Sequence, residues 1–152
     1  MKKTLLAITA MVSMCSYAQI PVQGFEDPWT GDPAAPPGWT VVNQDGPAQS
    51  WKQSTASNVD YPAFAGNHAA FINKENVAEG ASTPKDWLIS PSFTVAPNAR
   101  LQFYSRLTLS GDQGGIYKVL VGTDPANLSS FTEIYTATEL QLNPVQTEYS
   151  LN

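Results

Sequence analysis

The chain has 152 residues, of which 42% are hydrophobic and 14% charged, and its formal net charge is −5. This length suits one domain with its own core and is too short for two ordinary domains. The acidic balance makes nucleic acid and anionic membrane surfaces poor partners. One histidine and one cysteine are too few for a zinc site, and a lone cysteine excludes an internal disulfide.

The first 18 residues have the pattern of a secretory signal peptide. Lys2 and Lys3 give a positive start, and residues 4–14 form an apolar run. That run is shorter than the roughly 20 apolar residues that a membrane-spanning helix needs. It ends at Ser16-Tyr17-Ala18, which places small residues at the two positions that a signal peptidase recognises. We therefore predict cleavage after Ala18 and an exported domain over residues 19–152.

An alternative for the leader is a lipoprotein acylated on Cys15, but Met14 before it is not the small residue that such a site needs. Cleavage after residue 18 removes the cysteine and two lysines, which changes the net charge to −7. The exported domain then depends on core packing or a bound metal for stability, and its acidity makes calcium the metal to expect. After cleavage no segment is expected to insert into a membrane.

The pattern of residues predicts an all-β fold. Short runs rich in β-branched and aromatic residues alternate with 12 prolines and 10 glycines, and no 3.6-residue apolar period appears. Turn signals about every ten residues indicate a β-sandwich, with jelly-roll and Greek-key topologies both compatible. The proline-rich segment 27–38 is predicted to be an extended surface loop. Strands are expected at 22–26, 39–43, 50–53, 69–73, 87–89 with 92–95, 100–109, 116–122, 132–136 and 146–151.

The clearest strand is residues 100–109, in which Leu101, Phe103 and Leu107 alternate with polar residues. A glycine-rich turn at residues 110–115 separates it from the strand at 116–122. The two strands are predicted to form a long hairpin.

Several short motifs follow one another along the chain. They are Gly24-Phe25-Glu26, Pro37-Gly38-Trp39-Thr40, Asp45-Gly46, Trp51, Asp86-Trp87-Leu88-Ile89-Ser90-Pro91 and Leu101-Gln102-Phe103-Tyr104. In their order and spacing they resemble the cleaved adhesin domains, also called choice-of-anchor J. The resemblance covers about residues 25–135 and implies a jelly-roll sandwich similar to MAM and galactose-binding-like domains. It also implies a secreted or surface location in a Gram-negative bacterium and the adhesin role of the gingipain haemagglutinin modules.

The chain departs from this family at its C-terminal side, where family members normally continue with one or two further core strands and the larger ones with a sorting domain or anchor. Both a truncated reading frame and a minimal member whose sheet ends early fit the sequence. A sandwich that lacks its last strands would expose a hydrogen-bonding edge.

The resemblance also implies structural calcium, which takes six to eight oxygen ligands. Glu26, Asp45 and Asp86 match motif positions of the family, so we expect them to be the ligands, together with backbone carbonyls. The alternative is that each is a solvated turn carboxylate. Asp27 and Asp60 are weaker candidates on the same argument.

Two loop aromatics, Trp29 and Tyr61, are candidates for contacting a ligand, because an exposed aromatic ring can stack on a sugar. The alternative is that they hold their loops in place. The other tryptophans, Trp39, Trp51 and Trp87, lie inside predicted strands and are expected in the core.

We expect no enzymatic activity. His68 is the only histidine, no serine lies in a Gly-x-Ser-x-Gly elbow, and the glycines near residue 111 precede no Lys-Ser/Thr of a phosphate loop. The sequence favours a secreted binding module for an extracellular host protein or glycan. Two alternatives are a non-catalytic accessory domain of a secreted peptidase and a structural spacer.

Overall fold

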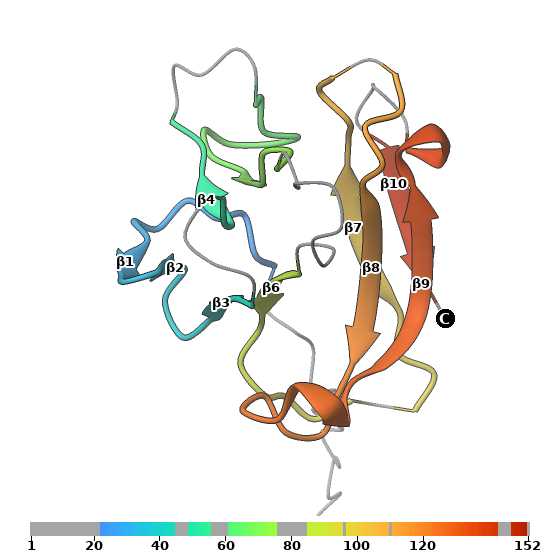
Figure 1. Cartoon of the computed structure of the whole chain (residues 1–152). Coiled ribbons are helices and arrows are strands. Elements are labelled where there is room, and N and C mark those ends of the chain that lie inside the picture. The colour runs from blue at the N-terminus through green and yellow to red at the C-terminus, as the bar shows by residue number, and fades with distance from the viewer. Residues whose placement is uncertain are drawn as a thin grey trace, which may run out of the picture.

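The computed structural model describes residues 22–44, 49–55, 61–75, 85–95, 97–109, 111–142 and 147–151 (Figure 1). The predicted signal peptide lies outside these ranges. Within them, the regular structure consists of ten strands and two 3-10 turns, which confirms the all-β prediction. None of the described segments is a helix long and apolar enough to cross a membrane.

The strands form five antiparallel pairs, β1–β2, β3–β6, β4–β5, β7–β10 and β8–β9. A 3-10 turn precedes β9 (η1, Leu128–Ser130) and another follows it (η2, Glu139–Gln141). The strands are β1 (Thr30–Gly31), β2 (Ala34–Ala35), β3 (Thr40–Asn43), β4 (Lys52–Gln53), β5 (Ala70–Phe71), β6 (Asp86–Ile89), β7 (Leu101–Ser105), β8 (Ile116–Val121), β9 (Thr132–Thr138) and β10 (Thr147–Leu151).

The pairs β7–β10 and β8–β9 stand together at one side of the molecule (Figure 1). Phe103 of β7 contacts Tyr117 of β8 and Tyr135 of β9, with ring centroids 6.0 and 6.3 Å apart. Tyr117 pairs with Ala137, which is 2% exposed. Aromatic rings therefore fill the space between two strand pairs, as in the core of a β-sandwich. The jelly-roll topology itself stays a prediction.

The pair β3–β6 forms the other buried region. Val41 and Ile89 are each 5% exposed, and they lie on adjacent strands of the pair. Trp87 of β6 contacts Phe131, which precedes β9, at a centroid distance of 5.6 Å. The tryptophan thus joins this pair to the start of β9. Trp39, Trp51 and Trp87 are all half-buried.

The hairpin predicted between residues 100–109 and 116–122 is wrong. β7 pairs with β10 and β8 pairs with β9. Phe103 and Tyr117 contact each other through tilted rings, with centroids 6.0 Å apart and planes 44° apart, so β7 and β8 meet through side chains and not through a shared ladder. The connecting segment, with Gly111 and Gly114 at positive φ, crosses from one layer to the other.

Three local predictions are also wrong. Residues 22–26 form no strand, because Phe25 has a φ of 59° and its N–H is bonded by the Gln23 side chain. Residues 92–95 form no strand, and Phe93 and Val95 there are 46% and 59% exposed. The predicted loop at residues 27–38 contains the short pair β1–β2.

Candidate binding surface

The Glu26 side chain bonds a turn that is distant from it in the sequence. Its Oε1 accepts hydrogen bonds from the backbone N–H groups of Asn67 and His68, at 2.9 and 3.1 Å. The turn begins at Gly66, whose φ is +79°. This positive φ favours glycine, and a Cβ there would lie 2.2 Å from Glu26 Oε1, so the Glu26 side chain would have to shift. One carboxylate oxygen of this predicted calcium ligand therefore has a structural role.

Asp86, the second predicted ligand, begins β6 opposite Asn43 and is half-buried. Its backbone carbonyl accepts a hydrogen bond of 3.2 Å from Trp51 Nε1. The third predicted ligand, Asp45, lies outside the described residues. In the part of the chain that the structure describes, no three acidic, histidine or cysteine side chains lie close enough to hold a metal ion. Calcium therefore stays a prediction.

Trp29 is half-buried in its proline-rich loop. Its ring lies 6.1 Å from that of Phe25, and its backbone N–H donates to Gln53 Oε1 at 3.4 Å. Gln53 Nε2 in turn donates to the carbonyls of Phe25 and Asp27, at 2.6 and 2.9 Å. These bonds tie the loop to β4. The role of Trp29 in ligand binding stays a prediction.

Tyr61 is also half-buried, and it contacts residues in and just after β5. Its ring stacks on Phe71 at 4.1 Å with planes 11° apart. Its hydroxyl donates to Asn73 Oδ1 at 2.7 Å. Tyr61 therefore attaches the chain before β5 to β5 itself and to the residues that follow β5. Its contact with a ligand stays a prediction.

The structure brings together an aromatic pair that the sequence analysis missed. Phe64 and Tyr104 stack with centroids 3.5 Å apart and planes 7° apart, and they are 55% and 42% exposed. The signal available in the sequence was a phenylalanine between two alanines in the stretch Pro62 to Gly66, which has no strand pattern.

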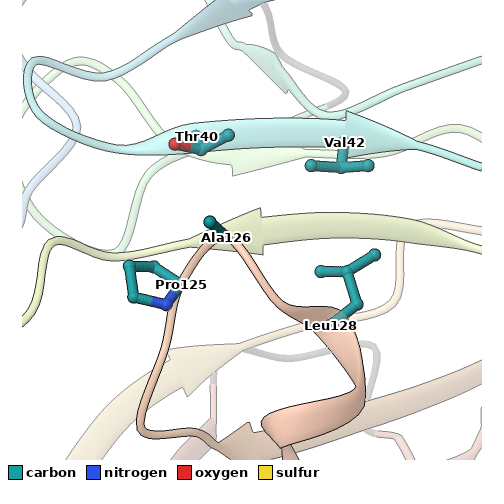
Figure 2. Close-up of a pocket in the computed structure, with 5 residues that line it drawn as sticks. All are labelled: Thr40, Val42, Pro125, Ala126 and Leu128. Carbon is teal, nitrogen blue, oxygen red and sulfur yellow. The ribbon is translucent and has the colours of Figure 1, made fainter.

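A hollow of about 350 Å³ lies between β3 and the loop before β9 (Figure 2). Asp124 and Asn127 fix this loop by accepting N–H bonds two residues ahead, at 3.0 and 3.1 Å. The lining carries no titratable group, so it offers no acid–base chemistry. It consists of Thr40, Val42, Pro125, Ala126 and Leu128.

These features can be set beside known proteins. Residues 27–150 match the sequence profile of the Cleaved Adhesin Domain family. The chain belongs to this family. Membership confirms the resemblance drawn from the sequence motifs.

Two curated relatives are both named Hemagglutinin A and come from Porphyromonas gingivalis. One, from strain ATCC BAA-308 / W83, is 27% identical over 99 residues, and the other is 26% identical over 99 residues. Each alignment covers 62% of this chain and 4% of the relative. The chain thus spans a small part of these relatives. No solved structure is significantly similar to the chain.

Proposed function

We propose that the chain is a non-catalytic, extracellular adhesin module that binds a host-surface protein or glycan. The observation that carries this proposal is the family match over residues 27–150. The name of its relatives, Hemagglutinin A, supports a ligand on a cell surface. The net charge of −5 favours neutral or basic ligands over acidic ones.

The architecture is better suited to presenting a binding surface than to catalysing a reaction. Paired strands give a stable frame, and loops fixed to such a frame are the usual location of binding residues. Weak single contacts gain strength when several copies act together, because the second contact becomes intramolecular. A module of this size therefore serves best as one of several copies on a surface.

Export through a leader over residues 1–18 is part of the proposal. The full chain, produced in a bacterium with a general secretion pathway, is expected outside the cytoplasm with Gln19 as its first residue. N-terminal sequencing of the exported protein tests this. A protein that keeps Met1 would contradict export by this leader.

Binding is tested with the exported chain attached at high density to beads. The beads are expected to bind erythrocytes and immobilised cell-surface glycoproteins, while beads carrying serum albumin do not. Removal of glycans with glycosidases, or of surface proteins with trypsin, then separates the two ligand classes. Beads that bind neither cells nor glycoproteins would contradict the adhesin proposal.

We also propose that calcium stabilises the domain through Glu26, Asp45 and Asp86. Both bonds from the turn at residues 67–68 end on Glu26 Oε1, so Oε2 is the oxygen that a cation would use. A bound ion would neutralise the carboxylates that hold it and would link the segments that carry them.

Thermal unfolding in EDTA and in millimolar calcium tests the metal. A ligand that binds only the folded state at 100 times its Kd adds about 2.7 kcal/mol of stability. We expect a higher Tm in calcium, a much smaller rise for Asp86→Asn, and an unchanged rise for the control Asp112→Asn. Equal Tm values in EDTA and calcium would contradict the calcium proposal but not the adhesin proposal.

A further inference from the structure

Two aromatic rings lie face to face on the surface beside β7. Phe64 comes from the segment between β4 and β5, and Tyr104 is on the exposed face of β7, where residues alternate between half-buried and exposed. The stacking covers the inner face of each ring, yet 55% of Phe64 and 42% of Tyr104 stay exposed. The neighbours of Phe64 are Ala63 and Ala65, whose small side chains can cover little of the ring.

The segment that carries Phe64 is fixed on both sides of the ring. Before it, Tyr61 stacks on Phe71 at 4.1 Å. After it, the N–H groups of Asn67 and His68 are bonded by Glu26.

The segment is attached a third time at Ala69, which is bonded by Ser54. The Ser54 hydroxyl, which is 2% exposed, accepts the Ala69 N–H at 2.8 Å. The backbone N–H of Ser54 donates to the Ala69 carbonyl, also at 2.8 Å. An apolar ring at the centre of so many attachments is held in place before any ligand arrives, which reduces the entropy cost of binding.

The chemistry of this surface fits a sugar ring better than a large protein interface. A pyranose has an apolar face of C–H groups with hydroxyls around it, and a flat aromatic ring covers that face. Two exposed amide side chains lie on the same elements, Gln102 on the same face of β7 as Tyr104 and Asn67 three residues after Phe64. Amides of this kind can bond sugar hydroxyls. A stable protein interface needs about 800 Å² from each partner, with an apolar core larger than two rings.

Charge narrows the class of sugar. The Glu26 carboxylate lies at the turn that follows Phe64, and the whole chain has a net charge of −5. An acidic sugar such as a sialic or uronic acid would be repelled by both.

We propose that Phe64, supported from behind by Tyr104, is the platform on which this module stacks a neutral pyranose of a host glycan. This proposal rests on the adhesin proposal, in which the family match suggests that the chain binds a cell surface. The stacked pair adds which residues contact the ligand and which class of ligand they bind. The site differs from Trp29 and Tyr61, which are half-buried.

The test uses the exported full chain and a panel of neutral methyl pyranosides, the methyl glycosides of galactose, mannose and N-acetylglucosamine, followed by NMR titration. The wild type is expected to bind one of them with a millimolar Kd. Phe64→Ala is expected to weaken that binding about tenfold, the effect of losing one aromatic contact. Tyr104→Ala removes the ring that supports Phe64 and is expected to weaken binding by a smaller factor. Phe64→Tyr keeps a ring and is expected to retain the affinity.

The control variant is Phe93→Ala, which removes an aromatic ring that is 46% exposed on another segment and is expected to leave binding unchanged. Near-ultraviolet circular dichroism checks that each variant is folded. Binding that survives Phe64→Ala, or tighter binding of N-acetylneuraminic acid than of every neutral sugar, would overturn the platform.

Two further outcomes separate this proposal from the adhesin proposal. If the wild type binds none of the neutral sugars while the beads still bind cells, the platform is wrong and the adhesin proposal stands. If the beads bind no cells and the sugars still bind through Phe64, the module recognises glycans away from host cells.

Discussion

Two regions of this chain are held together in different ways. The strands of β7–β10 and β8–β9 are five to seven residues long and are joined along their length, with one bulge in the β8–β9 ladder between Val119 and Leu120. The strands between residues 30 and 75 are two to four residues long. There the chain is held mainly by side chains that bond backbone groups far away in sequence, from Gln53, Ser54 and Glu26.

This difference indicates which parts of the protein tolerate changes in sequence. A ladder distributes its stabilisation over many residues, so it opens only as a unit, whereas a single side-chain bond can be lost without unfolding the rest. Loops held by single side chains can change their sequence and presented surface while the paired strands stay intact. The exposed aromatic pair lies where the two regions meet, with Phe64 from the loop region and Tyr104 from a long strand.

The largest effect is expected from Phe103→Ala. This change removes the ring that contacts Tyr117 and Tyr135 between the strand pairs, and large-to-small changes of this kind cost about 3 kcal/mol. Urea denaturation of the variant measures the loss, with the exposed neighbour Gln102→Ala as control. A loss under about 1 kcal/mol would show that the layers do not depend on this contact.

A smaller effect, about 1 to 2 kcal/mol, is expected from Ser54→Ala. The buried hydroxyl accepts the Ala69 N–H, and its removal leaves that donor without its partner. The exposed neighbour Thr55→Ala is the matched control, measured by urea denaturation. Equal stability of the two variants would contradict a stabilising role for Ser54.

Glu26→Gln is expected to cost about 1 kcal/mol or less, because an amide oxygen still accepts the two N–H groups but without the charge. The experiment is done in EDTA so that no bound cation contributes. Amide exchange of Asn67 and His68 should accelerate, while that of β8 stays unchanged. Unaltered exchange at the turn, with Asp27→Asn as control, would argue against this attachment.

The smallest effect is expected from Lys118→Met. Lys118 Nζ lies 2.6 Å from Glu133 Oε2, but the two side chains are 47% and 39% exposed, and such pairs contribute roughly 0.2 to 1 kcal/mol. The difference from wild type should shrink in 1 M salt. Lys52→Met, which removes a lysine bonded to a neutral Gln49, is the control. A loss that does not change with salt would exclude an electrostatic origin.

Much of the strand layout could be predicted from the sequence. Alternation in residues 100–109 and 116–122 placed β7 and β8, although the first predicted strand runs four residues past the end of β7. The motif around Trp87 placed β6 within one residue. Pairing could not be predicted in the same way, because alternation shows which face of a strand is buried and not which strand lies beside it. The turn residues after β7 suit a hairpin and a crossing between layers equally well.

The candidate site was predicted less well, for a physical reason. Exposure of an aromatic ring depends on contacts with distant residues, so Tyr61 and Phe64 cannot be distinguished by their similar loop positions. In the structure Tyr61 stacks on Phe71, while Phe64 stacks on Tyr104 and stays exposed. The motif position of Glu26 likewise does not reveal that its carboxylate bonds the turn after Gly66.

The central claim is that long paired strands form a stable frame to which individually attached loops are fixed. Amide hydrogen exchange of the exported chain, followed by mass spectrometry, tests it most directly. We expect the slowest exchange in β7, β8 and β9, and exchange at least tenfold faster in residues 25–35 and 61–69. Uniform exchange across both regions, or slower exchange in the loops than in β8 and β9, would contradict this account.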